Sequence, residues 1–237
     1  MLSVRCPTKM DRSPVMPLRV PPIKGSVRRA PPLRAMAAYL TPTTVQEKKL
    51  EARLTAAVSI KPLFDTAIEQ FVRQVDGFED QVYFHAAPVK DRTRILEKAE
   101  HKYEDDWGQV RDILRGAVIL EPKHDGTVPE EELRALFDQA LDADMFSDAK
   151  IEDHYSDPYR CGLRNFKLFF NFHGIPAEIQ FYTKKFWSYA SSKFDRSLYQ
   201  LRRSTKDPHT SVLILKAQQR QFQEIAAQEC LHGEDWD

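Results

Sequence analysis

The first feature of the sequence that could do chemistry is a run of basic residues spaced four apart. Its members are Lys90, Arg94, Lys98 and Lys102, with Arg92 beside them. Side chains four positions apart share a face of an α-helix, so the spacing predicts a one-sided row of cations. Such a row suits a polyphosphate. The competing interpretation is a solvated helix face on which Glu97 and Glu100 neutralise the cations.

Asp112 is a candidate magnesium ligand, because it stands where a short predicted helix meets the first apolar strand. A carboxylate at the end of a sheet can hold a hydrated Mg²⁺ ion, which typically uses one or two carboxylates together with substrate phosphates. Arg115 follows three positions later and adds a cation. A helix-end ion pair is the alternative interpretation of Asp112.

Glu178 lies inside a stretch of strong strand formers that runs from Ile175 to Thr183. On a strand, Glu178 and Gln180 project from one face, whereas Ile179 and its neighbours of the same parity project from the other. A charged residue in this setting indicates either a solvent-exposed face or a site, and both interpretations stay open.

Tyr159 and Arg160 directly precede another long predicted strand. A tyrosine ring beside a guanidinium can stack on a base and contact its phosphates, and the alternative is a core tyrosine next to a surface arginine. The sequence has no GxGxxG, GxxxxGK[ST] or GxSxG motif, and its seven histidines lack the spacing of metal ligands. Cys161 is interpreted as an idle thiol rather than a nucleophile.

Hydrophobic periodicity predicts the elements that must position these side chains. The predicted helices cover residues 44–57, 60–75, 88–103, 107–114, 129–142, 184–203 and 209–231. The predicted strands cover residues 117–120, 149–155, 163–173 and 175–183, with a hairpin at His173-Gly174. This order predicts an α+β fold in which a mixed β-sheet is flanked by helices.

Composition limits the classes of function. The 237 residues include 35 Lys+Arg and 35 Asp+Glu, and 42% are hydrophobic, which excludes a wholly disordered or collagen-like chain. No run of about 18 uncharged apolar residues occurs, so no transmembrane helix is expected. Three widely spaced cysteines argue against a zinc site and a disulfide framework, and they favour a reducing compartment such as the cytoplasm.

The net charge of zero hides an asymmetry. Residues 1–40 hold eight Lys/Arg, one acid and seven prolines, whereas residues 41–237 carry a net charge of −7. We expect residues 1–40 to be a disordered tail and residues 41–237 to be one domain. The tail fits an organelle transit peptide, a nucleic-acid-binding arm or an extension before a second start at Met36. Any anionic ligand of the acidic domain must meet a local basic patch.

Three sequence blocks, in order, resemble the RelA/SpoT-type nucleotidyltransferases, which comprise (p)ppGpp synthetases and related small or toxin-like synthetases. The first block is KDRTRILEK at residues 90–98, and the second is VRDILRG at residues 110–116. The third combines Tyr159-Arg160 with GIPAEIQFYT at residues 174–183. The resemblance covers roughly residues 88–203, and its third block is the most specific.

The resemblance implies a pyrophosphokinase that uses ATP and Mg²⁺. Asp112 would bind magnesium, and Glu178 would complete the metal site or activate a ribose 3′-hydroxyl. The implied ATP-binding residues are Lys90, Arg92, Arg94, Lys98, Lys102 and Arg115, with Arg92 near the adenine. The implied acceptor-binding residues are Tyr159, Arg160 and Gln180, with Tyr159 stacked on the acceptor base. Transfer of this kind needs charge on the polyphosphate and little covalent chemistry.

Departures from the family pattern leave the acceptor open. Pro158 replaces a common glycine, Lys98 a common serine, and Ala117 and Tyr182 stand where the family often has arginine. The acceptor is GDP, GTP, another purine nucleotide or the 3′ end of tRNA. The alternative function is a catalytically degenerate module that binds a nucleotide, RNA or a protein, and a toxin is a third hypothesis. The resemblance also suggests a homo-oligomer.

Overall fold

The computed structural model describes residues 45–123 and 128–230. The chain divides into two compact units, residues 1–48 and 49–237, and the candidate site belongs to the second. The predicted tail, residues 1–40, lies outside the described residues. None of the described helices is long and apolar enough to cross a membrane.

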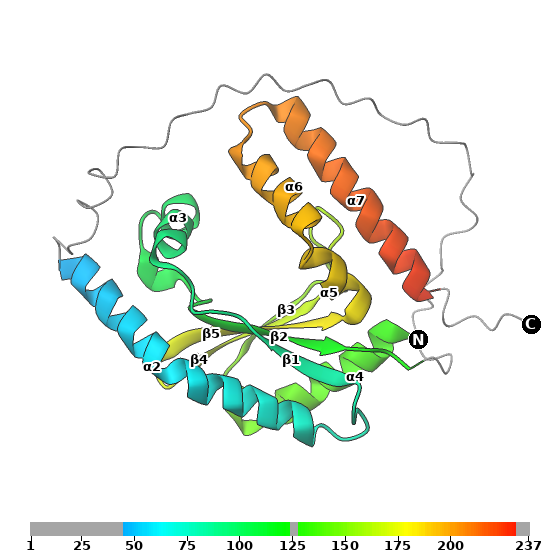
Figure 1. Cartoon of the computed structure of the whole chain (residues 1–237), viewed down its shortest axis with the longest axis horizontal. Helices are drawn as coiled ribbons and strands as arrows, with labels where there is room; N and C mark the ends of the chain where they lie inside the picture. The colour runs from blue at the N-terminus through cyan, green and yellow to red at the C-terminus, as the bar shows by residue number, and fades with distance from the viewer. Residues whose placement is uncertain (1–44, 124–127, 231–237) are drawn as a thin grey trace, which may run out of the picture. The chain divides into compact units, whose positions relative to one another are not determined.

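Helices and strands are mixed in the first half of the described chain, and three successive strands followed by three successive helices make up the second half (Figure 1). The helices are α2 Val45–Gln74, α3 Arg92–Lys102, α4 Pro129–Asp142, α5 Lys184–Ala190, α6 Lys193–Ser204 and α7 Pro208–Cys230, with the 3₁₀ turns η1 Trp107–Gln109 and η2 Asp144–Phe146. The strands are β1 Val82–Ala86, β2 Leu114–Leu120, β3 Lys150–Asp153, β4 Phe166–Phe172 and β5 Ile175–Thr183.

The five strands form one mixed sheet in the order β1-β2-β5-β4-β3. The central pair, β2 and β5, is parallel, and the other neighbours are antiparallel. The predicted mixed sheet flanked by helices is confirmed. Strand β1 was not among the predicted strands; it lies at the edge of the sheet, and none of its five residues is buried.

The sheet has two unlike faces. One face packs on α2 and α4 through a large apolar cluster that includes Phe64, Leu133 and Phe181. The other face has a smaller cluster, formed by Ile119 and Tyr182 with helices α5 and α7, and Figure 1 shows these helices on the side of the sheet opposite α2. Polar side chains fill the rest of this second face, because Glu178 and Gln180 alternate with the apolar residues of β5.

Several predicted boundaries are wrong. Residues 44–57 and 60–75 are not two helices, because α2 is continuous and contains Pro62. Buried Leu50 and Phe64 lie about four helical turns apart on its apolar face, so packing outweighs the backbone hydrogen bond that proline removes. The helix predicted over 184–203 is divided into α5 and α6 at Ser191-Ser192, where the Ser192 side chain accepts from the Asp195 N–H at 3.1 Å.

The segment around the first strand also differs from the prediction. The helix predicted over 107–114 is only the η1 turn, and β2 begins at Leu114 rather than at residue 117. Gly116 lies inside β2 because a Cβ atom there would stand 2.2 Å from Cε2 of Phe84 on β1. Glycine therefore allows β1 to pack on β2.

Other predictions are confirmed. Helix α4 has the predicted bounds, 129–142, and begins with Pro129. The β4–β5 hairpin turns at His173 and Gly174, which have φ angles of 48° and 79°. Both angles fit the type I′ turn that suits the twist of a hairpin. Asp207 caps α7 by accepting from the N–H groups of His209 and Thr210.

Candidate active site

Asp112 is held between two ammonium groups. Lys90 Nζ donates to Asp112 Oδ2 at 2.5 Å, and Lys98 Nζ donates to Oδ1 at 2.8 Å. Asp112 is buried, and burial alone would raise its pKa, but the two lysines outweigh burial and hold the pKa below its usual value. The carboxylate is therefore ionised and shared by two cations.

The two lysines reach Asp112 from different elements. Asp91 caps α3 by accepting from the Thr93 N–H at 2.8 Å, so the helix predicted over 88–103 begins at Arg92. Lys90 precedes the helix, and its backbone N–H donates to the Ile113 carbonyl at 3.0 Å. Lys98 extends from α3 itself. The prediction that Lys90 belongs to a helical row is wrong, although its side chain still joins Lys98 at Asp112.

Lys90 is one of the few buried lysines that the described chain contains. Burial lowers the pKa of its ammonium, and the ion pair with Asp112 opposes this shift. Lys98 and Arg115 lie close enough to lower the Lys90 pKa further by repulsion. Two lysines thus share one carboxylate while Arg115 lies close to Lys90, which leaves a local excess of positive charge.

Arg115 connects this cluster to Glu178. Its Nε donates to the Pro88 carbonyl at 3.3 Å, beside the loop that carries Lys90. In the parallel pairing of β2 and β5, Arg115 lies directly opposite Glu178. The Asp112 cluster and Glu178 therefore stand near the amino-terminal ends of two neighbouring parallel strands.

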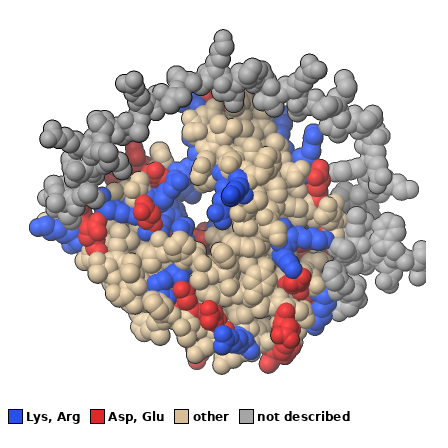
Figure 2. Space-filling model, in the orientation of Figure 1, with Lys and Arg blue, Asp and Glu red and all other residues tan. Residues whose placement is uncertain are grey.

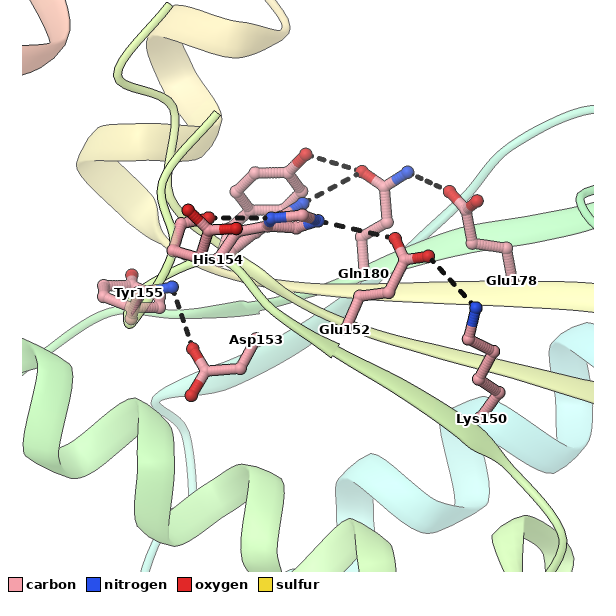
Figure 3. Close-up of polar contacts among 10 residues, drawn as sticks. Lys150, Glu152, Asp153, His154, Tyr155, Glu178 and Gln180 are labelled. Atoms are coloured by element: carbon pink, nitrogen blue, oxygen red, sulfur yellow. Dashed lines mark hydrogen bonds and ion pairs between the residues drawn. The ribbon is translucent and has the colours of Figure 1, made fainter. Parts of the chain in front are cut away.

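Glu178 is buried and oriented by a chain of hydrogen bonds along β5 (Figure 3). Gln180 Nε2 donates to Glu178 Oε1, and the Tyr182 hydroxyl donates to Gln180 Oε1 at 2.5 Å. Asn165 Nδ2 adds a weaker bond to the same amide oxygen at 3.5 Å. The predicted common face of Glu178 and Gln180 is confirmed, and this chain fixes which way the Gln180 amide points.

Tyr159 lies in the loop before β4, on the polar face of the sheet. Its ring centroid is 3.8 Å from that of His154, and Lys167 Nζ lies 5.2 Å from the Tyr159 centroid. Burial, followed by the nearby Glu152 and Glu178, raises the pKa of the Tyr159 hydroxyl well above its usual value. The phenol therefore stays neutral, and Tyr159 offers an aromatic surface close to Glu178.

The remaining predicted residues are spread more widely. Arg92 pairs with Glu51 of α2 at 2.8 Å, and Arg94 pairs with Glu97 at 2.8 Å on the surface of α3. Lys102 is exposed at the end of the helix, and Arg160 is exposed in the Tyr159 loop. The structure thus brings together Lys90, Lys98, Asp112 and Arg115, while the role of the other basic residues stays a prediction.

Sequence reasoning missed the polar residues of β3 and β4 that border the site. Glu152, His154 and Lys167 lie on the same face as Gln180, because Lys167 pairs with Gln180 on one side and with Glu152 on the other. Figure 3 shows Glu152 between Lys150 and His154, on the same side of the sheet as Gln180 and Glu178. Polar and apolar residues alternate along these strands, which indicates that the polar residues share one face. Only the order of the strands shows that this face adjoins Gln180 on β5.

The donor set for a metal ion is small. Among residues 45–123 and 128–230, no cluster of three His, Cys, Asp or Glu side chains suits a metal. Asp112 and Glu178 are two carboxylates at one end of the β2–β5 pair, which fits the one or two protein carboxylates that Mg²⁺ uses when phosphates supply further oxygens.

A search of protein-family models and a search of curated proteins each found no match. Solved structures do match. Small alarmone synthetase 1 from Bacillus subtilis is 15% identical, with a TM-score of 0.56 and coverage of 78% of this chain and 95% of that chain. The Type VI effector Tas1, solved with its immunity protein, is 16% identical, with a TM-score of 0.53 and coverage of 76% and 97%.

A GTP pyrophosphokinase family protein from Streptococcus pneumoniae is 16% identical, with a TM-score of 0.51 over 80% of this chain and 93% of that chain. The chain has a RelA/SpoT-like fold. At these identities the likeness establishes the fold and leaves the reaction to the residues of the site.

Proposed function

We propose that the protein is a Mg²⁺-dependent pyrophosphokinase that transfers the β,γ-pyrophosphate of ATP to a 3′-hydroxyl group. The observation that carries the proposal is the buried cluster of Lys90, Lys98 and Arg115 around Asp112, next to Glu178 on the adjacent strand. This arrangement combines cations for a polyphosphate with two carboxylates for a metal and a hydroxyl, which are the groups that phosphoryl transfer needs.

The solved structures with the same fold support this reaction class. They include small alarmone synthetase 1 bound to its product pppGpp and a GTP pyrophosphokinase family protein. This chain has the fold of those proteins and places carboxylates and cations at the start of its central parallel strands. We therefore propose the same kind of transfer here.

In the proposed reaction, the acceptor 3′-oxygen forms a bond to the β-phosphorus of ATP. The bond between that phosphorus and the oxygen bridging to the α-phosphorus breaks, and AMP leaves with the bridging oxygen. Glu178 accepts the proton of the hydroxyl, while Gln180 and Tyr182 keep its carboxylate oriented. Lys90, Lys98 and Arg115 bind the phosphates, because the two lysines contact Asp112 and Arg115 lies close to Lys90.

Asp112 and Glu178 are the residues that would hold Mg²⁺. The ion would supply positive charge to the polyphosphate. When a nucleotide binds, its phosphates compete with Asp112 for Lys90 and Lys98, which frees carboxylate oxygens for other contacts. Lys98 is the more mobile of the two candidates for this exchange, because its side chain is 22% exposed, compared with 10% for Lys90.

The acceptor base is proposed to stack on Tyr159, with Arg160 and Gln180 beside it. GDP, GTP, another purine nucleotide and the 3′ end of tRNA all carry a base and a ribose hydroxyl that this arrangement can bind. The His154 ring already covers part of Tyr159 at 3.8 Å, so the base must use the remaining surface of the ring or displace the imidazole.

Radiolabel transfer tests the proposal. Purified protein is incubated with γ-labelled ATP and Mg²⁺ and, separately, with GDP, GTP, ADP and bulk tRNA. We expect AMP release together with label on one acceptor, and loss of both in Glu178→Ala and Asp112→Ala. Absence of transfer from a folded protein to every acceptor would contradict the proposal, as would unchanged activity in both variants.

A catalytically degenerate binding module is the second candidate function. It is favoured by the pairing of both Asp112 oxygens with lysines, an arrangement that also serves as a buried structural ion pair. In that case ATP or GDP binds in calorimetry without AMP release, and Asp112→Ala lowers stability without changing nucleotide affinity. A pyrophosphokinase instead loses both affinity and turnover.

A further inference from the structure

Helix α6, the loop after it and the first half of α7, residues 193–220, form a basic arm on an acidic domain. It contains seven Lys/Arg and two Asp, a net charge of +5, whereas the rest of residues 41–237 carries −12. Helix α6 packs along α7, and Figure 2 shows blue Lys and Arg side chains on the surface over α6. Positive charge is therefore concentrated on one supersecondary unit.

Both acids of the basic arm are used internally. Asp195 is buried and accepts from Gln218 Nε2 of α7 at 2.6 Å, which joins the two helices. Asp207 caps the start of α7 through the N–H groups of His209 and Thr210 at 3.2 and 3.0 Å. Neither carboxylate forms an ion pair with a lysine or arginine of the arm, although Arg202 lies close enough to Asp195 to oppose the rise that burial causes in the pKa of that carboxyl. The other cations of the arm are left to its outer surface.

Within the described part of the chain, no lysine or arginine of the arm forms an ion pair with a carboxylate. Lys193, Arg196 and Arg203 are exposed and lie on one face of α6, because steps of three and seven residues return to the same side of a helix. Lys206, Lys216 and Arg220 are exposed on the loop and on α7. On α3, by contrast, Arg94 and Lys98 are paired with carboxylates.

Aromatic rings lie among these cations. Phe194 is 59% exposed and Tyr199 is 46% exposed, which is unusual for large aromatic side chains. The guanidinium groups of Arg202 and Arg203 each lie 5.7 Å from the centroid of Tyr199. Exposed rings between cations are what successive bases and phosphates of a single strand require.

The basic arm is continuous with the acceptor side of the site. Gln219 Nε2 of α7 donates to the Arg160 carbonyl at 2.6 Å, and a Cβ at Gly162 would stand 3.0 Å from Cβ of Phe222. The loop that presents Tyr159 and Arg160 therefore rests on the arm. A strand bound along α6 would pass next to Tyr159.

We propose that the basic arm is a docking surface for single-stranded nucleic acid. The concentrated, unpaired positive charge favours a polyanion over an ordinary protein partner, and the interleaved rings favour unpaired bases over a duplex. The proposal does not depend on the pyrophosphokinase reaction. It holds equally for a catalytically degenerate chain.

Fluorescence anisotropy with the full-length protein tests the proposal. The probe is a labelled uridine oligonucleotide, and a duplex of equal length is the comparison. If four phosphates are contacted, binding weakens about 50-fold between about 50 and about 200 mM salt, and the logarithmic slope is about −2.8. The duplex is expected to bind more weakly, because its bases cannot stack on Phe194 or Tyr199.

Charge reversal on the arm separates it from other basic segments. We expect Arg196→Glu with Arg203→Glu to weaken oligonucleotide binding at least tenfold and to reduce the salt slope by about 1.4. Lys49→Glu with Arg73→Glu on α2 makes the same charge change at exposed positions and is the matched control. Residues 1–40 are present in every variant, so their contribution cancels in the comparison.

The stacking contribution is tested separately with Tyr199→Leu, which keeps an apolar side chain and removes the ring. We expect roughly fivefold weaker oligonucleotide binding and an unchanged salt slope. Thermal melting of each variant verifies folding. Equal binding by the arm variant and the α2 control would overturn the proposal. The absence of oligonucleotide binding by the folded wild-type protein would overturn it as well.

Discussion

Asp112 is the residue on which stability and the proposed chemistry both depend. Its carboxylate is the only acidic partner that the structure, in its described part, gives to Lys90 Nζ. Removing one member of a buried pair leaves the other charge without compensation, which typically costs more than the net stabilisation of the intact pair.

We therefore expect Asp112→Asn to lower the free energy of unfolding by about 3–5 kcal/mol. Lys98→Met is expected to cost less, because the Lys98 side chain is partly exposed and Lys90 still pairs with Asp112. Urea denaturation measures both, with exposed Asp138→Asn on α4 as the control. Addition of Lys90→Met to Asp112→Asn is expected to restore part of the loss. A double variant less stable than Asp112→Asn would contradict this account.

A second expectation at the residue scale concerns the hydrogen-bond chain on β5. Tyr182→Phe removes the hydroxyl that donates to Gln180 Oε1 at 2.5 Å and keeps the buried ring. If Glu178 accepts the acceptor proton, kcat falls about 10-fold while KM for ATP stays the same, since outer partners of a functional carboxylate typically matter to this extent. Steady-state kinetics decide the matter. A change in KM for ATP alone would place Tyr182 on the donor side instead.

The sequence predicted some of these residue contacts and not others. The common face of Glu178 and Gln180 follows from the two-residue period of a strand, so it was predictable. The contact of Lys90 with Asp112 was not predictable from spacing. It depends on the loop before α3. Because the helix begins only at Arg92, this loop places the Lys90 backbone beside Ile113.

At the scale of elements, the end of α7 is joined to the end of β5 by a buried carboxyl group. Thr183 Oγ1 donates to Glu229 Oε1. Burial raises the pKa of Glu229 to about 7, above its usual value of 4.5. The folded protein therefore holds a proton that the unfolded chain releases between these two values.

This linkage has a definite sign. Between pH 4.5 and about 7 the native state binds one more proton at Glu229 than the unfolded state does, so stability falls as pH rises. We expect the free energy of unfolding to fall by about 3 kcal/mol over this window relative to Glu229→Gln, which cannot ionise. Urea melts of both proteins at several pH values measure the difference. Parallel pH profiles would show that Glu229 is already ionised in the fold.

Elements with strong local signals were the ones predicted correctly. Helix α4 begins with Pro129 and three glutamates, and its bounds agree with the prediction. Helix α2 was divided wrongly because Pro62 is a strong local breaker, and only the packing of Phe64 and Ile68 in the core overrides it. Strand β1 has little burial of its own and is specified by pairing with β2.

At the scale of the whole molecule, charge is divided between two basic regions and an acidic remainder. One region surrounds Asp112, and the other is the basic arm of residues 193–220. Nothing in the local sequence of α6 shows that Asp195 turns toward Gln218 of α7, so the basic surface of the arm could be seen only from the packing of α6 on α7.

Because the basic arm is separate from the Asp112 cluster, substitutions on the arm are expected to affect transfer to a large acceptor and not transfer to a small one. Arg196→Glu with Arg203→Glu is expected to leave transfer of label to GDP within twofold of wild type, because these residues lie on α6 and not at Asp112. Transfer to tRNA is expected to fall at least tenfold and to become less sensitive to salt. The measurement is the rate of label transfer to GDP and to tRNA, each compared between the double variant and the wild type. Equal loss with both would mean that the substitutions disturb the site itself.

The parallel pairing of β2 with β5 also decides when the site can exist. Leu114 and Ala177 are neighbours in the sheet although 63 positions separate them along the chain. Closing so long a loop is slow, so this central pairing forms late in folding. A chain emerging from the ribosome carries the lysines and Asp112 long before it carries Glu178. The proposed site is therefore incomplete in a nascent molecule until β5 has been synthesised and inserted between β2 and β4.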